Sequence, residues 1–351
     1  MPFLKDNEFF LLMDNPFSAP QEDIFAHKNM PPTWQEVYKH IDLEGLKKLR
    51  DVGIQTTMPF TTIWKEIERE PGVFDWSYFD GYIERASQAG MKVLLFGVTA
   101  GYPEWLPDAY FIQTQNREVQ RSCMSPWNPE GLEAMNEFNK RIVERYSSDD
   151  CLVVNSQLSC GETVLINEPA FYDPLAIASF QRFSDSEDLP DPADNLTNQW
   201  LLDSYLKMLV GQQEIFIQNK WREIFLMLHP AIADFQGLYG NGCNWIEDIL
   251  AEYTRKLEGV KINHIYYTWI QWNQYWARMG YWRAKFNENV FGGGEYAEGL
   301  PMTTPHAIQQ GLRGQIISPC YPGIHDNGVE DWMLNNIRTA QSMWEQSRIA
   351  S

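Results

Sequence analysis

The sequence contains no apolar run long enough to cross a membrane. A transmembrane helix needs about 18 to 20 consecutive apolar residues, and no stretch of the 351-residue chain reaches that length. The first residues, MPFLKDNEFF, also lack the basic segment and following apolar stretch of an export signal. We therefore expect a chain that spans no membrane and resides in the cytoplasm.

Positive charge and metal-binding cysteine patterns are also scarce. The chain has 28 Lys and Arg against 47 Asp and Glu, a formal net charge of −19. Such a charge repels phosphate backbones and anionic lipid, which argues against nucleic acid and membrane surfaces as partners.

No CxxC pair or Cys/His cluster occurs among the five scattered cysteines: Cys123, Cys151, Cys160, Cys243 and Cys320. We expect buried thiols, no metal site and no cofactor.

Aromatic residues, in contrast, are abundant, with 14 Trp, 16 Tyr and 19 Phe. Hydrophobic residues make up 44% and charged residues 21% of the chain, which is typical of a folded globular protein. Most of the rings are expected in the core, because each buries a large apolar area. Trp and Tyr also stack on the apolar faces of sugars, so some rings are candidates for a carbohydrate-binding surface.

Eight short apolar runs alternate with amphipathic stretches, a pattern typical of βα units around a parallel sheet. The runs lie at residues 9–14, 53–60, 91–99, 151–159, 224–229, 261–269, 288–294 and 314–319. Eight is the number of strands in a (β/α)8 barrel. The predicted fold class is therefore α/β, a (β/α)8 TIM barrel, with residues 1–351 in a single domain.

Amphipathic helices are predicted between the runs. Residues 34–51, 79–89 and 132–146 carry apolar side chains at helix-face spacing. The long gap between the fourth and fifth runs holds the polar loop SDSEDLPDPADN and then a predicted helix over about 198–222. We interpret residues 184–222 as a loop and helix insertion in the barrel, because a polar loop of this kind does not by itself separate two domains.

Two glutamates follow predicted strand ends, where a (β/α)8 barrel places its catalytic groups. Glu162 follows the fourth run, in NSQLSCGET, and Glu295 follows the seventh, in VFGGGEY. A glycosidase needs one carboxylic acid to protonate the leaving oxygen and one carboxylate to attack the anomeric carbon or activate water. A glycine directly precedes each glutamate and leaves room for a substrate. The pair predicts a glycoside hydrolase that works without a cofactor.

Each of these glutamates has a rival nearby. Glu168 lies in Asn-Glu-Pro, the tripeptide that carries the acid/base in many barrel glycosidases, but it stands well beyond the last strand-like residue. Glu298 lies close to Glu295. We favour Glu162 over Glu168 because the end of a barrel strand is the usual place of a catalytic group.

Other strand ends supply candidates for substrate binding. These polar or aromatic residues are Asp14, Trp64, Gln157, His229, Trp269 and Trp272. A carboxylate such as Asp14 can bind two sugar hydroxyls at once, and Trp272 offers a stacking platform, with core burial as an equal alternative. A lone histidine is more often a core residue than a catalytic one, so we predict only a hydrogen bond from His229 to substrate.

Three segments within residues 31–108 resemble a known family. They are DVGIQTTMPFTTIW, EREPGVFDWSYFDGYIERASQAGMKVLLFG and YPEWLPD. Together they resemble the amino-terminal part of the barrel in β-galactosidases of glycoside hydrolase family 42 and related clan A enzymes. In this pattern Glu70-Pro71-Gly72 forms a turn. The resemblance further implies that Tyr102 and Trp105 line the sugar subsite.

The Gly161-Glu162 element is similar to barrel glycosidases related to β-amylases, which carry their acid on a Gly-Glu after the fourth strand. Resemblance to clan A implies that Glu162 is the acid/base and Glu295 the nucleophile of a retaining enzyme. Gly161 stands where clan A enzymes usually have Asn, so an inverting glycosidase stays an alternative. The resemblance also implies a barrel without the extra domains of family 42.

Two other function classes compete with a glycosidase. A catalytically silent barrel would keep the aromatic cleft for carbohydrate recognition alone. A metal-dependent barrel enzyme would need a cluster of His, Asp and Glu at ligand spacing, which the sequence does not contain. Carbohydrate is therefore the expected partner, while the sugar and its linkage stay open.

Overall fold

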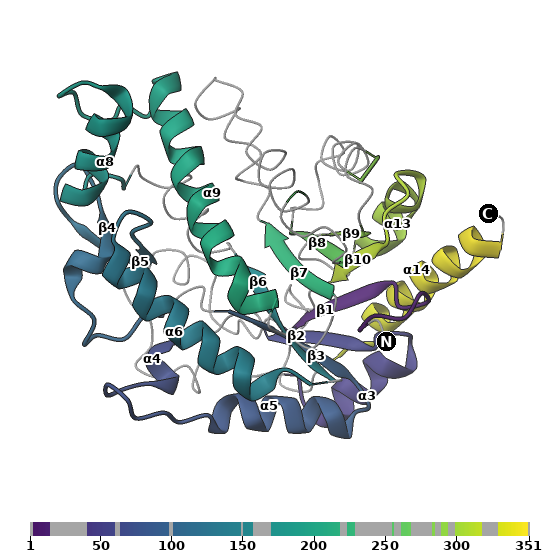
Figure 1. Cartoon of the computed structure of the whole chain (residues 1–351). Coiled ribbons are helices and arrows are strands. Elements are labelled where there is room, and N and C mark those ends of the chain that lie inside the picture. The colour runs from purple at the N-terminus through teal and green to yellow at the C-terminus, as the bar shows by residue number, and fades with distance from the viewer. Residues whose placement is uncertain are drawn as a thin grey trace.

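Eight parallel strands close into a barrel in the computed structural model of the chain (Figure 1). The structure describes residues 3–14, 41–59, 64–97, 101–148, 150–156, 170–217, 223–228, 255, 261–267, 283–284, 289–293, 299–317 and 329–349. The barrel strands are β1 (Phe10–Asp14), β2 (Thr56–Pro59), β3 (Lys92–Phe96), β6 (Cys151–Ser156), β7 (Glu223–Leu228), β8 (Lys261–Tyr267), β9 (Asn289–Gly293) and β10 (Gly314–Ile317). Every predicted apolar run overlaps one of them, so the predicted (β/α)8 class is confirmed.

The barrel closes where the first strand meets the last. Around the ring the order is β1-β10-β9-β8-β7-β6-β3-β2, and β1 pairs with both β10 and β2. All four residues of β2 and of β10 are buried, as expected for strands covered on both faces. Gly314 allows the close approach of β10 to β1, because a Cβ at this position would lie 2.3 Å from the carbonyl oxygen of Phe9.

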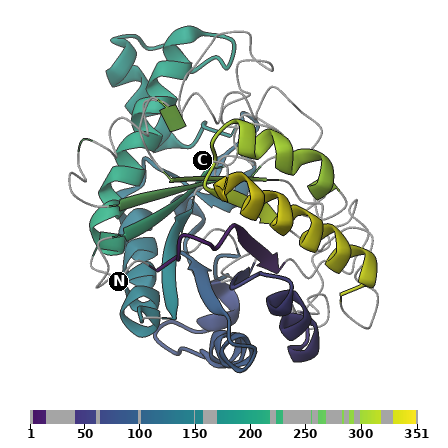
Figure 2. The ribbon, with the colours of Figure 1, turned by 90° about the vertical axis from the view of Figure 1, so that its right-hand side faces the viewer.

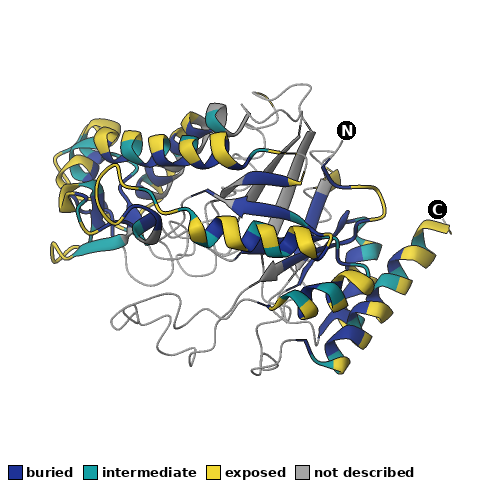
Figure 3. Ribbon diagram, turned by 90° about the horizontal axis from the view of Figure 1, so that it is seen from below, coloured by how far each residue is buried: buried dark blue, intermediate teal, exposed yellow. Residues whose placement is uncertain are grey.

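Amphipathic helices pack around the barrel with their exposed residues outward (Figure 3). They include α3 (Leu43–Asp51), α5 (Ser77–Gln88), α6 (Pro129–Tyr146), α13 (Leu300–Gln309) and α14 (Asp331–Ile349). The last two lie side by side (Figure 2). In α6, Met135, Phe138, Ile142 and Tyr146 are buried at helical spacing. Its start is fixed by Asn128, whose side chain accepts a hydrogen bond of 2.9 Å from the Gly131 amide.

Two further helices lie between β6 and β7, and the first ends where the predicted insertion of residues 184–222 begins while the second lies inside it. They are α8 (Pro174–Ser184) and α9 (Asn195–Ile217). The predicted helix over 198–222 is thus present, with its start three residues earlier than expected. The interpretation of residues 184–222 as an insertion in a single domain stays a prediction.

An antiparallel hairpin between β3 and β6 was not predicted from the sequence. It follows a 3-10 turn, η1 (Asp108–Tyr110), and consists of β4 (Phe111–Gln113) and β5 (Val119–Met124). Figure 1 places it beside α6 and below α8, outside the barrel sheet. A three-residue strand is too short to show the alternation by which strands are recognised in a sequence.

Membrane-spanning helices and buried cysteines were also considered in the sequence, and the described residues give a finding on each. None of the helices described is long and apolar enough to span a membrane. The side chains of Cys123 and Cys151 are buried, as predicted. Burial raises the pKa of the Cys151 thiol well above its ordinary value. Cys160, Cys243 and Cys320 lie outside the described residues.

Candidate active site

The carboxyl ends of the barrel strands determine where the candidate residues leave the sheet. Asp14 ends β1 and pairs in register with Pro59 at the end of β2. The segment with Glu162 follows β6, and the segment with Glu295 follows β9. In the ring, β7 and β8 separate β6 from β9. The two glutamate-bearing segments therefore start three strands apart on the same end of the barrel.

Most of the predicted substrate-contacting residues lie outside the described residues. This holds for both glutamates and for their rivals and neighbours on the strand ends: Glu162, Glu168, Glu295, Glu298, Gln157, His229, Trp269 and Trp272. Their roles stay predictions. Described in full are the three aromatic candidates that follow β2 and β3, namely Trp64, Tyr102 and Trp105.

These three aromatic candidates form one cluster. Trp64, the first residue of α4 (Trp64–Ile67), stacks on Phe138 with 4.6 Å between ring centroids. Tyr102 and Trp105 meet the Trp64 ring edge-on at 6.2 and 6.1 Å. The structure thus brings together residues that the sequence places after two different strands.

Glu68 holds the cluster through both its side chain and its backbone. Its carboxylate accepts a hydrogen bond of 2.6 Å from Nε1 of Trp64 and one of 2.7 Å from the amide of Gly72. Its carbonyl oxygen accepts a third, of 3.0 Å, from Nε1 of Trp105. Glu68 is only 6% exposed, so these donors replace the water that a buried carboxylate has lost. Sequence analysis did not single out this residue.

The turn beside Glu68 has the conformation that the sequence predicts. The amide of Val73 donates to the carbonyl oxygen of Glu70 at 3.0 Å, and Gly72 has a φ of +79°. Glycine adopts this left-handed conformation without steric cost, which explains its place in the turn. The predicted turn at Glu70-Pro71-Gly72 is confirmed.

The aromatic candidates differ in how far solvent reaches them. Trp64 and Tyr102 are 2% and 3% exposed, and the Tyr102 hydroxyl lies 3.9 Å from Sδ of Met135. Trp105 is half-buried. The structure gives the first two rings a packing role beneath the third, and their predicted contact with a sugar stays a prediction. Of these three rings, only Trp105 is partly exposed to solvent.

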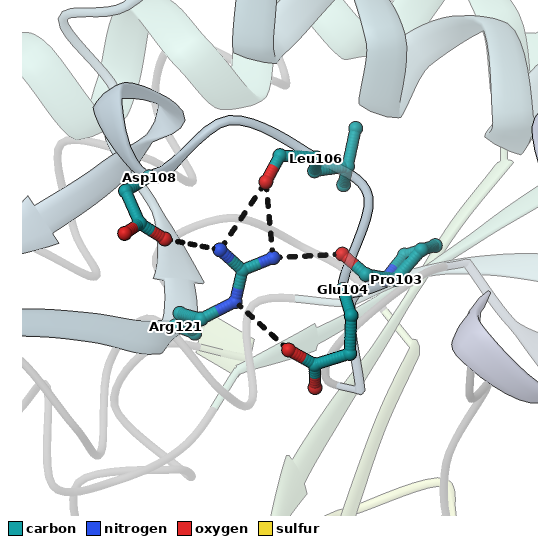
Figure 4. A network of polar contacts seen from close by, with 5 residues as sticks. All are labelled: Pro103, Glu104, Leu106, Asp108 and Arg121. Atoms are coloured by element: carbon teal, nitrogen blue, oxygen red, sulfur yellow. Dashed lines mark hydrogen bonds and ion pairs between the residues drawn. The ribbon is translucent and has the colours of Figure 1, made fainter.

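A second anchor holds the segment after β3 from the hairpin side (Figure 4). Nη2 of Arg121, on β5, donates to the carbonyl oxygens of Pro103 at 2.8 Å and Leu106 at 3.1 Å. The guanidinium also forms ion pairs with Asp108 and, at 3.8 Å, with Glu104. Residues 103–108 are therefore fastened to β5 through one side chain.

The same hairpin contacts the chain where it returns from the segment after β6. The amide of Tyr172 donates to the carbonyl oxygen of Gln113 at 2.9 Å, and Arg117 donates to the carbonyl oxygen of Tyr172 at 2.5 Å. Tyr172 is 5% exposed. The residues that follow the Glu162 segment are thus tied to β4 and to the hairpin turn.

Asp173 completes this attachment and starts α8. Its side chain accepts hydrogen bonds from the Leu175 and Ala176 amides at 3.2 and 3.0 Å, as a helix N-cap does. The Ser125 hydroxyl donates to its other oxygen at 3.2 Å. Asp173 is 2% exposed, and burial raises the pKa of its carboxyl even though these hydrogen bonds oppose the rise.

Among the residues that the structure describes, no group of three or more His, Cys, Asp or Glu side chains is placed to hold a metal ion. The acidic side chains described above are instead engaged by N–H and O–H donors. The chemistry that this part of the molecule supports is hydrogen bonding and aromatic stacking.

Comparison with known sequences gives a family match. The model of glycoside hydrolase family 42, described as β-galactosidase, matches residues 29–207, just over half of the chain. A β-galactosidase of Thermus thermophilus is 27% identical over 133 residues, which cover 34% of this chain and 20% of that protein. The β-galactosidase BgaH of Haloferax lucentense is 32% identical over 65 residues, 18% of this chain and 10% of that protein. The aligned part of the chain thus spans a fifth or less of these two relatives.

Comparison with solved structures extends over nearly the whole chain. The β-galactosidase of the psychrophilic Marinomonas ef1 superposes with a TM-score of 0.69 at 13% identity, covering 97% of this chain and 60% of that one. The catalytic domain of β-amylase from Paenibacillus polymyxa gives a TM-score of 0.68 at 11% identity, covering 95% and 98%. At such low identity the likeness concerns the fold, and it agrees with the closed barrel described above.

Proposed function

We propose a function from one premise: the chain belongs to glycoside hydrolase family 42, the family described as β-galactosidase. Distant homology to β-galactosidases suggests a glycoside hydrolase. We propose that the protein cleaves O-glycosidic bonds in β-galactosides, with carbohydrate as its substrate and no cofactor. The single observation that carries the proposal is the family match over residues 29–207, which includes the aromatic cluster and the hairpin.

The proposed chemistry uses Glu162 as acid/base and Glu295 as nucleophile. Glu295 attacks the anomeric carbon while Glu162 donates a proton to the leaving oxygen. Water then attacks the glycosyl-enzyme, and Glu162 takes up its proton as the Glu295 bond breaks. Barrel order supports the pairing, because the two segments start from β6 and β9 at the same end of the ring. A carboxyl separation of about 5 to 5.5 Å would be required for this retaining course.

We also propose which residues contact the substrate, choosing those that end or follow barrel strands in the sequence. Of the three aromatic candidates described, Trp105 is the one that is partly exposed, so we assign it to stacking on the sugar, with Trp64 and Tyr102 as its support. Asp14 at the end of β1 is proposed to accept hydrogen bonds from sugar hydroxyls. Gln157, His229, Trp269 and Trp272 follow β6, β7 and β8 and complete the proposed subsite.

Substitution of the two glutamates tests this proposal. Glu162→Gln and Glu295→Gln are each expected to lower kcat for a nitrophenyl β-D-galactoside by at least about a thousandfold. The matched controls are Glu168→Gln and Glu298→Gln, which make the same change on the same two segments and should retain activity. An active Glu295→Gln variant, or an inactive Glu168→Gln variant beside an active Glu162→Gln one, would contradict the assignment.

The stereochemical course needs a separate measurement, because Gly161 leaves the inverting alternative open. Proton NMR of the first sugar released from a β-galactoside distinguishes the two courses: the β-anomer indicates retention and the α-anomer inversion. If wild-type protein cleaves no β-galactoside, a panel of other nitrophenyl glycosides tests whether the substrate class or the hydrolase activity is wrong.

A further inference from the structure

We propose that the β4–β5 hairpin braces the two segments that flank the proposed cleft, and that Arg121 is the positioning residue for Trp105. The inference rests on the proposed function, since it takes Trp105 to face the sugar. Its basis is that one small element outside the barrel sheet contacts both the segment after β3 and the end of the segment after β6.

The guanidinium of Arg121 donates hydrogen bonds to backbone carbonyl oxygens of the segment after β3. It binds the carbonyl oxygens of Pro103 and Leu106, which lie on either side of Trp105 in the chain. The planar guanidinium presents several donors in a fixed fork, so it fixes both carbonyls at once. It also lies over the ring of Phe111, 4.4 Å from the centroid. Its own geometry is therefore fixed by the hairpin strand next to it.

The carboxylates that pair with Arg121 are less important to this geometry. Their side chains are 84% exposed for Glu104 and 69% exposed for Asp108, whereas that of Arg121 is 27% exposed. Ion pairs with such exposed partners contribute little, because water screens them. We therefore attribute the positioning mainly to the carbonyl hydrogen bonds.

Residues in and directly after α4 hold Trp105 and its segment from the side opposite Arg121. Nε1 of Trp105 donates to the carbonyl oxygen of Glu68, and nearby the amide of Lys65 donates to the carbonyl oxygen of Gly101 at 2.7 Å. The segment is thus held by α4 on one side and by β5 on the other. Loss of the guanidinium would release the backbone on both sides of Trp105 while the indole stays tethered, which would tilt the ring.

Other contacts of the hairpin are with Tyr172 and Asp173, which follow the Glu162 segment in the chain. Gln113 and Arg117 bind the backbone of Tyr172, and Ser125 binds Asp173. These contacts involve different hairpin residues from Arg121. A change at Arg121 is therefore expected to act on the sugar-binding side and to leave the acid/base side in place, which predicts weaker binding with little change in the chemical step.

The test compares Arg121→Lys with Arg145→Lys. Lysine keeps the charge but loses the fork that binds two carbonyls. Arg145 is a matched control because its guanidinium also pairs with an aspartate, Asp80 at 2.7 Å, and lies over a ring, Trp76 at 5.7 Å, but contacts neither segment of the proposed cleft. Three measurements are made: hydrogen exchange of residues 101–111, the Kd for isopropyl β-D-thiogalactoside by calorimetry, and KM and kcat for a nitrophenyl β-D-galactoside.

Arg121→Lys is expected to speed exchange in residues 101–111 and to raise Kd and KM about tenfold, with kcat changed less than about twofold. Arg145→Lys should change none of these values. If Arg121→Lys does not fold, Arg121→Gln serves as the second variant, because its amide keeps donors for one carbonyl but cannot bind those of Pro103 and Leu106 together, and the same rise in Kd and KM is expected.

Unchanged Kd and KM in folded Arg121→Lys would overturn the inference and leave the proposed function intact. The same holds for a fall in kcat as large as the rise in KM. A wild-type protein that neither binds nor cleaves any glycoside would overturn the proposed function, and this inference with it.

Discussion

Glu68 and Asp173 show how single buried carboxylates organise the segments around the barrel. Both are nearly inaccessible to solvent, and both are satisfied by N–H or O–H donors from residues distant in sequence or in the adjacent turn. Leaving a buried donor or acceptor unpaired costs about 1–3 kcal/mol. Such residues therefore fix the geometry of their neighbours more strongly than the exposed ion pairs of the chain do.

Asp173 gives the stability a dependence on pH that can be measured. Burial raises its pKa in the folded state, so its contribution is most favourable below the unfolded pKa of about 3.9 and is lost as pH rises through the folded pKa. Asn cannot titrate but still caps α8. The free energy of unfolding of Asp173→Asn, relative to wild type, is expected to increase from pH 4 to pH 7 in urea titrations.

Asp75→Asn is the control for this experiment because its shift has the opposite sign. Hydrogen bonds from Ser77 lower the pKa of the exposed Asp75, so its contribution is present above the unfolded pKa and lost as pH falls. The relative stability of Asp75→Asn should thus fall as pH rises through the acid range. Parallel slopes for the two variants would show that burial does not dominate at Asp173.

At the scale of elements, the barrel strands and the outer helices differ in whether they can accommodate a larger side chain at a glycine. Barrel strands are buried on both faces, and β10 approaches β1 closely at Gly314. Outer helices have one face toward solvent, and an added methyl group at Gly81 in α5 meets no atom within 4 Å. The same substitution, glycine to alanine, is therefore expected to have opposite effects in the two kinds of element.

Gly314→Ala is expected to lower the free energy of unfolding by about 1–3 kcal/mol, because the new Cβ forces β10 away from the Phe9 carbonyl oxygen. Gly81→Ala should raise it by about 0.5–1 kcal/mol through the better helix propensity of alanine. Urea unfolding of both variants provides the measurement. Equal stability of the two variants would mean that the strand contact is more compliant than the structure indicates.

At the scale of the whole molecule, the chain's first described segment is tied to distant strands. Arg313, just before β10, donates to the carbonyl oxygen of Glu8 at 2.9 Å. Lys92 at the start of β3 pairs with the Glu8 carboxylate at 3.4 Å, and Glu8 is 1% exposed. Residues more than 300 positions apart are therefore joined directly by a hydrogen bond.

We predict that the chain unfolds in one cooperative transition. Far-ultraviolet circular dichroism and tryptophan fluorescence should give the same midpoint in urea, and Arg313→Ala should lower both midpoints together because it removes the donors to the Glu8 segment. Two separated midpoints would instead favour independent parts and contradict the single-domain interpretation of residues 1–351.

The barrel strands, the turn at Gly72 and the main helices were predictable, because each has a local signal: an apolar run, the Glu-Pro-Gly tripeptide of the family-like segment, or apolar side chains at helical spacing. The roles of Glu68 and Arg121 had no such signal. Trp105 and Glu68 are 37 residues apart, and a charged residue in a strand usually indicates a solvent-exposed face. The short β4 strand was missed for lack of length.

The sequence by itself determined the number and order of the barrel strands and two glutamates suited to glycosidic chemistry, because apolar periodicity and residue type are local properties of the chain. Only the tertiary structure decided which aromatic candidates are buried and which residue holds the segment around Trp105. Those outcomes depend on contacts between different elements, such as Trp105 with Glu68 and Arg121 with Pro103, which no local pattern in the sequence records.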